Sequence, residues 1–491
     1  MEHKSDQLKP MTFVGSVFKF SIATWINAVI YLATLIIASY VFGDSGVYGL
    51  YNLFFLGSST VTSVAMLGLD FAYIRYYKKP PAGIKNSRQL ATACMGMSIT
   101  SLFTISLVIC LALPGQISAL FFEGDETMSR FIVLLCVNAL FLLVTRYFNI
   151  TYRMQQNARM YTIHTILYQF FSRMFFIVGA IFGPTLDNVI WFNIAGLGAF
   201  TLVFFMLQRR TMLPRKVDFN FKSYKPLFRY GLPLVPAAFI QYINTLFGSI
   251  YVNAVMGEQQ LGIFSFVSNV SLALAVVQAG FSVFWSAFIF GNFKTEQRKI
   301  RRVHDYLMFV MLSMMALLIL AQPVIFGIFG ETYRPGARIF GLMMFAPMLL
   351  ILSESTVYGI EIAKKTVFNS IAIAINVGLN IVLCVLLIPA YGMAGAAAAI
   401  AIAGLAMFIF RTIMAQIFYR TIDYPVKTVV SIALMAVLCV IDYLFTENIA
   451  VIALCAAGLI VYYLIAYRSE FKRCLSLARE VVASHRKKKQ C

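Results

Sequence analysis

Charged residues are scarce in this chain. Asp, Glu, Lys and Arg make up 12% of its 491 residues, whereas hydrophobic residues make up 60%. A soluble domain carries roughly 25% charged residues, so the composition excludes an ordinary soluble protein. Apolar runs of about 20 residues recur along the chain, and each is long enough to cross the hydrocarbon core of a bilayer.

The sequence also lacks the usual signals of catalysis and of metal or nucleotide binding. Its eight cysteines occur singly with no CxxC pair, and its four histidines have no metal-ligand spacing. Neither a disulfide framework nor a zinc site is therefore expected. No GxxxxGKS or GxxxxGKT loop is present, which argues against ATP hydrolysis by this chain. We expect no cofactor.

Fourteen apolar stretches are predicted to cross the membrane as helices. They lie near residues 14–42, 47–74, 90–113, 129–150, 160–183, 188–207, 230–255, 261–290, 305–329, 337–361, 366–389, 394–418, 426–445 and 449–467. The first stretch lacks a small-residue cleavage site, so we expect it to stay as a helix rather than be removed. The expected fold class is an all-α integral membrane protein.

The basic residues follow the alternation of the loops. The formal net charge is +20, and 36 of the 40 Lys and Arg residues fall on one side of the predicted membrane. By the positive-inside rule, both termini are expected in the cytoplasm. The basic run at 486–489 is expected to lie against anionic lipid headgroups. No nucleic-acid-binding pattern accompanies it, so we expect no nucleic-acid partner.

An internal repeat relates the two halves of the chain. Ile-Ala-Gly-Leu occurs at 194–197 and again 208 residues later at 402–405, and Arg130 recurs as Arg338 at the same offset. The run that includes Gly49 recurs, slightly slipped, around Gly262. A repeat of this length in a hydrophobic chain predicts two related membrane bundles with a substrate path between them, which is typical of a transporter.

The repeat and the loops predict the domain organisation. We expect an N-terminal six-helix lobe over 1–208, a basic cytoplasmic linker over 209–229, a C-terminal six-helix lobe over 230–420, helices 13 and 14 within 421–467, and a basic cytoplasmic tail over 468–491. Because six is an even number, the two lobes are expected to be parallel repeats. Two prolines, Pro233 and Pro236, open the second lobe and predict a bend there.

Arg173 is the clearest charge at membrane depth. It falls about 13 residues into the fifth span, roughly 20 Å from the cytoplasmic end. A charge at this depth is costly and usually functional, so Arg173 is expected to face a wet cavity or a buried partner. In a cavity it would bind a phosphate or pyrophosphate.

Applying the same offset to other residues yields two further pairs. Arg130 and Arg338 begin spans 4 and 10 at the predicted outer mouth, where they either contact an anion or reach the surface. Arg146 maps onto Glu354, so equivalent positions carry opposite charges. One hypothesis is that the two side chains meet between the lobes and form a gate. Disulfide trapping of cysteines introduced at 146 and 354 tests this, and the absence of a cross-link in every state would refute it. In the alternative, each is satisfied within its own lobe.

Further polar residues complete the predicted substrate contacts. Arg75 lies near the inner end of the second span, and Gln241 and Asn244 put amides along the seventh. Amides suit sugars, although they also form ordinary hydrogen bonds between helices. An acidic cluster, Glu123, Asp125 and Glu126, would suit the metal or base of a membrane glycosyltransferase, or else forms a solvated turn.

Several motifs resemble those of polysaccharide and O-antigen flippases. The run 228–236 resembles the start of their second half, 256–264 is similar to their turn between spans 7 and 8, and 387–397 resembles their span 11–12 signature. These proteins form a branch of the multidrug/oligosaccharidyl-lipid/polysaccharide exporter superfamily. The resemblance covers essentially the whole chain, including the fourteen-span count.

The resemblance implies a non-enzymatic flippase of undecaprenyl-pyrophosphate-linked oligosaccharides, with membrane lipids and the polysaccharide polymerase machinery as partners. Sister branches of the superfamily remain as alternatives. A multidrug antiporter usually carries a coupling acidic residue in its first span or in spans 7 and 8. Here the first span has Asn27 and no acid, and spans 7 and 8 have Glu258 only in the outer turn between them. A lipid II flippase would share the span count and the use of arginines in the cavity.

Overall fold

Helices are the only regular elements of the described chain. The computed structural model describes residues 26–112 except 28, 129–212, 221–272 and 288–472, with a few single positions between 273 and 287. Hydrocarbon offers the backbone no hydrogen-bond partners, and a helix satisfies each peptide group within its own segment. The expected all-α membrane class is confirmed.

Part of the sequence-based prediction lies outside the described residues. This applies to residues 1–25, to the acidic cluster Glu123, Asp125 and Glu126, to 213–220 of the linker, and to 473–491 of the basic tail.

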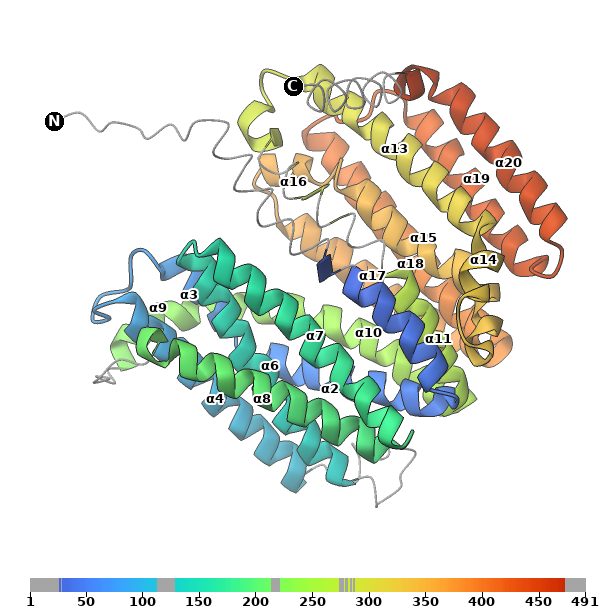
Figure 1. Cartoon of the computed structure of the whole chain (residues 1–491). Helices are drawn as coiled ribbons and strands as arrows, with labels where there is room; N and C mark the ends of the chain where they lie inside the picture. The colour runs from blue at the N-terminus through green and yellow to red at the C-terminus, as the bar shows by residue number, and fades with distance from the viewer. Residues whose placement is uncertain are drawn as a thin grey trace, which may run out of the picture. The chain divides into compact units, whose positions relative to one another are not determined.

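The first group of helices forms one compact unit. Its members are a helix over Val29–Val41, α2 (Ser45–Ala65), α3 (Leu69–Tyr76), α4 (Ser87–Ala112), α6 (Ser129–Met154), α7 (Ala158–Phe182), α8 (Leu186–Met212), α9 (Phe221–Gly231), the 3-10 turn η2 (Leu232–Leu234), α10 (Val235–Met256) and α11 (Glu258–Ser271). Figure 1 shows α4, α6, α7 and α8 running roughly side by side. Polar side chains cap several of these helices. Asp44, for example, accepts a hydrogen bond from the Gly46 N–H at 2.8 Å.

The second unit contains the later helices. These are α13 (Gln297–Leu320), α14 (Gln322–Gly327), the 3-10 helix η3 (Glu331–Gly336), α15 (Ala337–Ser353), α16 (Tyr358–Ile362), α17 (Val367–Tyr391), α18 (Met393–Phe418), α19 (Pro425–Leu444) and α20 (Ile449–Ala466). In this unit α15 packs against α13, α18 and α19, and α20 packs against α13 and α19. The last two helices therefore join the second bundle through α13 and α15.

The two units divide the chain at Val270, and Ile381–Gly392 clusters with the first unit. Contacts thus group α10 and α11 with α2, whereas the sequence assigns them to a lobe over 230–420. The two groupings rest on different criteria, since one follows contacts in this conformation and the other follows the repeat. The lobe boundaries stay a prediction.

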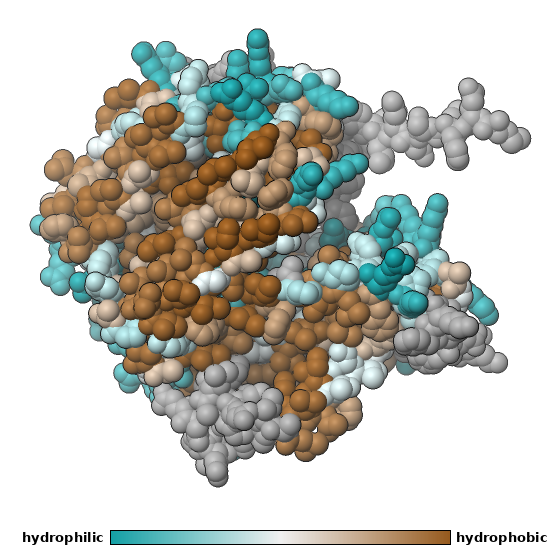
Figure 2. All heavy atoms as spheres, turned by 180° about the vertical axis from the view of Figure 1, so that it is seen from behind, coloured by the Kyte–Doolittle hydropathy of each residue, from teal (hydrophilic) through white to brown (hydrophobic). Residues whose placement is uncertain are grey.

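The helices match the predicted spans. A described helix covers at least part of each of the fourteen stretches. Nine helices of the described chain qualify as spans by length and composition, or eleven when two bent pairs are included. One of the nine, Val367–Phe418, comprises both α17 and α18. Figure 2 shows apolar side chains over most of one face, as expected for a surface in contact with lipid.

Two spans bend where the sequence places flexible or helix-breaking residues. Between α2 and α3 the chain turns by 53°, and both Leu67 (φ 50°) and Gly68 (φ 67°) adopt the left-handed conformation there. Close packing reinforces the requirement for glycine at position 68, because an added Cβ would overlap the carbonyl oxygen of Gly231. The segments Tyr224–Leu234 and Phe239–Met256 meet at 43°, which confirms the bend predicted from Pro233 and Pro236.

The repeat-related segments around Gly49 and Gly262 pack directly on each other in the first unit. A Cβ added at Gly49 would lie 2.6 Å from the Gly262 backbone nitrogen, and one at Gly262 would overlap the Ser45 carbonyl oxygen. Ser45 Oγ also donates to the Gln259 carbonyl oxygen at 3.0 Å. Small residues allow helix backbones to approach this closely within a membrane. The contact between α2 and α11 therefore depends on glycine at both positions.

We expect Gly262→Ala to destabilise the first unit, because the added methyl group must push two backbones apart. Overpacking of this kind costs about 1–3 kcal/mol. Thermal unfolding of the purified protein measures the loss. Gly248→Ala on α10 is the matched control, since an added Cβ there meets nothing within 4 Å. Equal melting temperatures for the two variants would contradict the prediction.

Candidate functional site

A cavity of about 450 Å³ lies within the first unit. Residues of α2, α3, α6, α7 and the start of α10 line it, and the bend at Gly68 forms part of its wall. Its polar lining comprises Ser59, Thr62, Ser63, Asp70, Thr145, Arg146, Asn149, His164, Thr165, Tyr168, Gln169 and Tyr242. The volume falls in the range of small-molecule sites, roughly 300–1,000 Å³. A lining this polar is unusual within spans this apolar.

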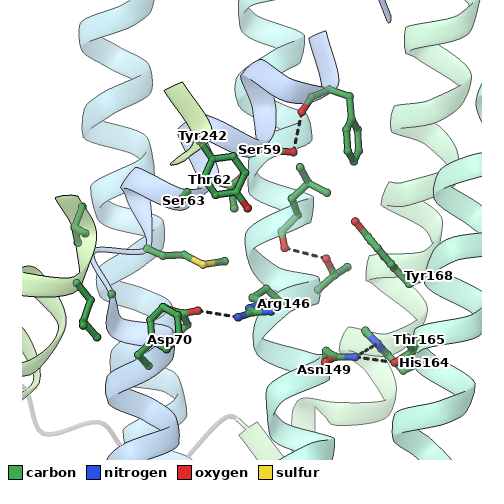
Figure 3. A pocket seen from close by; sticks show the side chains of 18 of the residues that line it. Ser59, Thr62, Ser63, Asp70, Arg146, Asn149, His164, Thr165, Tyr168 and Tyr242 are labelled. Carbon is green, nitrogen blue, oxygen red and sulfur yellow. Dashed lines mark hydrogen bonds and ion pairs between the residues drawn. The ribbon is translucent and has the colours of Figure 1, made fainter. Parts of the chain in front are cut away.

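Arg146 carries the positive charge of this cavity. In Figure 3 it lies at the centre, with Asp70 on one side and Tyr168 on the other. Its Nη2 donates to Asp70 Oδ2 at 3.2 Å, and the Asp70 side chain is only 6% exposed whereas that of Arg146 is 48% exposed. Asp70 thus anchors the guanidinium on one side. A guanidinium has five N–H donors, so Arg146 can bind an anion without leaving Asp70.

Four hydroxyl groups of the cavity wall bond to their own helices. Each hydroxyl group donates to the carbonyl oxygen four residues earlier, at 2.7–2.8 Å. The four residues are Ser59, Thr62, Thr145 and Thr165. Such bonds are the usual way for Ser and Thr to satisfy their protons in an apolar helix.

His164 is a packing residue at the cavity edge. It is 2% exposed and lies edge-on to the rings of Phe200 and Phe204, with centroid distances of 5.1 and 4.7 Å. Asn149 approaches its Nδ1 at 3.4 Å and donates to Thr165 Oγ1 at 2.9 Å. Within the described residues, no three His, Cys, Asp or Glu side chains are placed to hold a metal ion.

Arg173 lies deeper in the same unit, five residues beyond Tyr168 on α7, or roughly 7–8 Å along the helix. Its guanidinium stacks 4.1 Å from the ring centroid of Tyr31, and among the described residues it has no carboxylate at ion-pair distance. Its Nε is buried with no hydrogen-bond partner in the same part of the chain. A cation–π contact neutralises no charge, so this guanidinium has no counter-charge among the described residues.

Amides hold the aromatic partner of Arg173 in place. The Tyr31 hydroxyl donates to the backbone oxygen and to Oδ1 of Asn269, at 2.8 and 3.1 Å. Asn269 in turn donates to Tyr48 and Asn52 on α2, each at 3.1 Å. This network joins the Val29–Val41 helix, α2 and α11 around the deep cation.

The second unit contains the repeat-related counterpart of the cavity pair. Gln278 Nε2 donates to Glu354 Oε1 at 3.0 Å. Gln278 and Glu354 lie 208 residues after Asp70 and Arg146, and the members of both pairs are 76 residues apart. Each half therefore satisfies this position internally, with an ion pair in one and an amide–carboxylate bond in the other. A gate contact between Arg146 and Glu354 stays a prediction.

The other predicted contact residues lie outside the cavity lining. Arg130 pairs with the exposed Asp187, and Arg338 lies over the Tyr443 ring at 4.9 Å in the second unit. Arg75 is exposed on α3. On α10 the lining residue is Tyr242, rather than Gln241 or Asn244.

Sequence reasoning missed most of the cavity wall. Asn149 lies three residues after Arg146 on the same face of α6, a spacing that could have identified it. Tyr168 and Gln169 precede Arg173 on one helix. The role of Tyr31 could not be predicted from the sequence, because its contacts, Arg173 and Asn269, lie far from it in the chain.

Solved structures with this fold are membrane transporters. The inward closed conformation of the lipid II flippase MurJ matches with a TM-score of 0.70 and 18% identity, over 93% of this chain and 99% of that one. An inward-facing multidrug resistance transporter of the MATE family has a TM-score of 0.57 and 14% identity, over 81% and 97%. A superfamily transporter from Pyrococcus furiosus gives 0.55 and 14%, over 86% and 96%. At these identities the likeness establishes the fold.

Sequence comparison identifies the family. No curated protein matches the chain. The family model described as "Polysaccharide biosynthesis protein" matches residues 44–338, which is more than half of the chain. This match agrees with the resemblance to polysaccharide flippases and with the transporter fold. The chain therefore belongs to the polysaccharide biosynthesis protein family.

Proposed function

We propose that this protein flips undecaprenyl-pyrophosphate-linked oligosaccharide repeat units across the bacterial cytoplasmic membrane by alternating access, for surface polysaccharide synthesis. The observation that carries the proposal is the half-exposed Arg146 in a polar cavity inside an otherwise apolar bundle. A cation at this depth is costly unless a ligand or function requires it. Pyrophosphate matches a guanidinium in charge and in hydrogen-bond geometry.

In this proposal the two arginines of the first unit act in succession. Arg146 receives the pyrophosphate at the end of the cavity that the charge pattern assigns to the cytoplasm. Arg173, stacked on Tyr31 and free of any described carboxylate partner, attracts it further along α7. The glycan occupies the polar cavity, and the prenyl tail stays in lipid. With no nucleotide loop in the sequence, the energy comes from an ion gradient or from use of the product outside.

Lipid II flipping is the second candidate, favoured by the match to MurJ over 93% of this chain. Both substrates present an undecaprenyl pyrophosphate, so the same arginines would serve. The family match favours the polysaccharide substrate. We further propose that the termini are cytoplasmic and that a polysaccharide polymerase takes the product on the outer side.

Deletion of the gene separates the candidate functions. Loss of a polysaccharide flippase leaves complete lipid-linked repeat units in the inner leaflet, whereas loss of a glycosyltransferase leaves truncated ones. Loss of a lipid II flippase blocks cell-wall synthesis, and loss of a drug exporter changes drug sensitivity only. Mass spectrometry of extracted lipid-linked sugars makes the measurement. We expect complete units, and any other pattern contradicts the proposal.

Variants of the Arg146–Asp70 pair distinguish substrate binding from structure. Arg146→Gln removes the anion contact, and a charge-assisted hydrogen bond contributes about 1.5–3 kcal/mol, on the order of tenfold to a hundredfold in affinity. Asp70→Asn keeps the arginine and the shape of its partner. We expect export to fall sharply in Arg146→Gln and only slightly in Asp70→Asn, with both proteins in the membrane. Equal losses would make the pair structural.

Replacing Arg173 with Ala should abolish glycan export while the protein still inserts into the membrane. Arg173→Lys keeps the positive charge but loses the planar stacking on Tyr31, so it should retain part of the activity. Export is measured as surface polysaccharide, with membrane levels checked by immunoblotting. Unchanged export in Arg173→Ala would contradict a role in the substrate path.

A further inference from the structure

A second buried carboxyl group lies outside the proposed substrate path. Asp442 is on α19 and is 0% exposed, and neither of its oxygens has a partner in good hydrogen-bond geometry within the described chain, although the Gly341 backbone lies close to it. The other buried carboxylate of a span, Asp70, has Arg146 at 3.2 Å. A buried carboxylate without a partner or water is strongly disfavoured as an anion.

The packing around Asp442 is tight and apolar. A Cβ added at Gly341 on α15 would lie 2.6 Å from Asp442 Oδ2 and 3.6 Å from Ile319 Cδ1 of α13. The carboxyl group therefore lies directly on the α15 backbone, at a position where only glycine leaves room. It is enclosed by α13 and α15 rather than by solvent.

Few titratable groups face Asp442 from the helices packed on α19. On α19 itself the titratable neighbours are Tyr443, the next residue, and the buried thiol Cys439, one turn away. The ionisable residues of α13 all fall between 298 and 306, roughly 20 Å from Ile319. On α20 there is no charged residue, only Cys455 and two tyrosines further along, Tyr462 and Tyr463.

The remaining charges near this end of the described unit are either paired or exposed. Glu331 and Arg334 of η3 pair with each other at 3.3 Å. Glu447 is exposed in the loop after α19.

Arg338 is the one cation of the described α13, α15, α19 and α20 that contacts a residue next to Asp442. It lies one turn before Gly341 on α15, where its Nε donates to the Tyr443 carbonyl oxygen at 3.4 Å and its guanidinium stacks on the Tyr443 ring at 4.9 Å. It thus contacts the residue next to Asp442 without pairing with the carboxylate. Its repeat-related equivalent, Arg130, does pair with a carboxylate, that of Asp187.

We propose that Asp442 is a proton-binding site, occupied in this conformation, and that Arg338 becomes the partner of the carboxylate when the proton leaves. The neutral acid suits an enclosed apolar site and leaves Arg338 on Tyr443. Deprotonation creates an anion one turn from the guanidinium, which then moves from Tyr443 to Asp442. The ligand is a proton, and the site is independent of the proposed glycan substrate.

Infrared spectroscopy of the purified full-length protein in lipid nanodiscs tests the site without any substrate. A protonated carboxyl group has a C=O stretch separate from that of a carboxylate. We expect the wild type to show, at neutral pH, a protonated-carboxyl band that Asp442→Asn lacks and Asp187→Asn retains. The band should disappear as the pH is raised. Superimposable spectra of wild type and Asp442→Asn at every pH would overturn the proposal.

Thermal unfolding provides a second readout. If folded Asp442 holds a proton that the unfolded chain releases, the wild-type melting temperature must fall relative to Asp442→Asn as the pH rises. Should the Asn variant not fold, Asp442→Leu replaces it as a neutral side chain with the same branching. Parallel pH dependence in wild type and neutral variant would contradict proton binding.

Arg338→Gln tests the partner. Without the guanidinium the anion loses its stabilisation, so the Asp442 band should persist to higher pH, by on the order of one pH unit. Arg130→Gln, at the equivalent position of the first unit, is the matched control and should leave the band unchanged. A band unaffected by Arg338→Gln would exclude Arg338 as the partner.

Discussion

The absence of water in the hydrocarbon core is the constraint on which this structure depends. Every polar group placed there needs a partner within the protein. Ser and Thr of the cavity bond to their own helices, Asp70 meets Arg146, and Asn269 links Tyr31 to α2. Arg173 has no counter-charge among the described residues, and the buried carboxyl group of Asp442 has no described side-chain partner. A ligand is proposed for both of these groups.

The internal repeat places hydrogen-bonded side chains at equivalent positions of the two halves, but the residue types at those positions differ. Asp70–Arg146 and Gln278–Glu354 occupy the same two places in the two halves, yet one pair contains a cation and the other does not. The two repeats thus place a hydrogen-bonded pair of side chains at equivalent positions. The residue types within each pair determine whether the pair includes a cation. The pair in the first half therefore includes a cation, whereas the equivalent pair in the second half does not.

Much of the fold could be predicted from hydropathy. The stretch predicted at 160–183 is α7, Ala158–Phe182, and that at 449–467 is α20, Ile449–Ala466, because apolar length directly sets a span. The bend at Gly68 within a predicted single span could not, since it depends on contact with Gly231. For the site, the offset of 208 related Arg146 to Glu354, and a contact between these two residues stays a prediction. The offset could not indicate Asp70 or Gln278 as their hydrogen-bond partners, because symmetry relates residues without bringing them together.

The hydroxyl groups of the cavity wall have a consequence for selectivity. Since the protons of Ser59, Thr62, Thr145 and Thr165 are engaged with backbone carbonyls, these side chains offer the cavity only lone pairs. A ligand that forms hydrogen bonds with these side chains must supply the donor groups. Sugar hydroxyl groups do so at almost every ring carbon, whereas an alkylated glycan or a quaternary ammonium compound has none to give. These four positions therefore complement hydrogen-bond donors, whereas Arg146 and Gln169 carry donors elsewhere on the same wall.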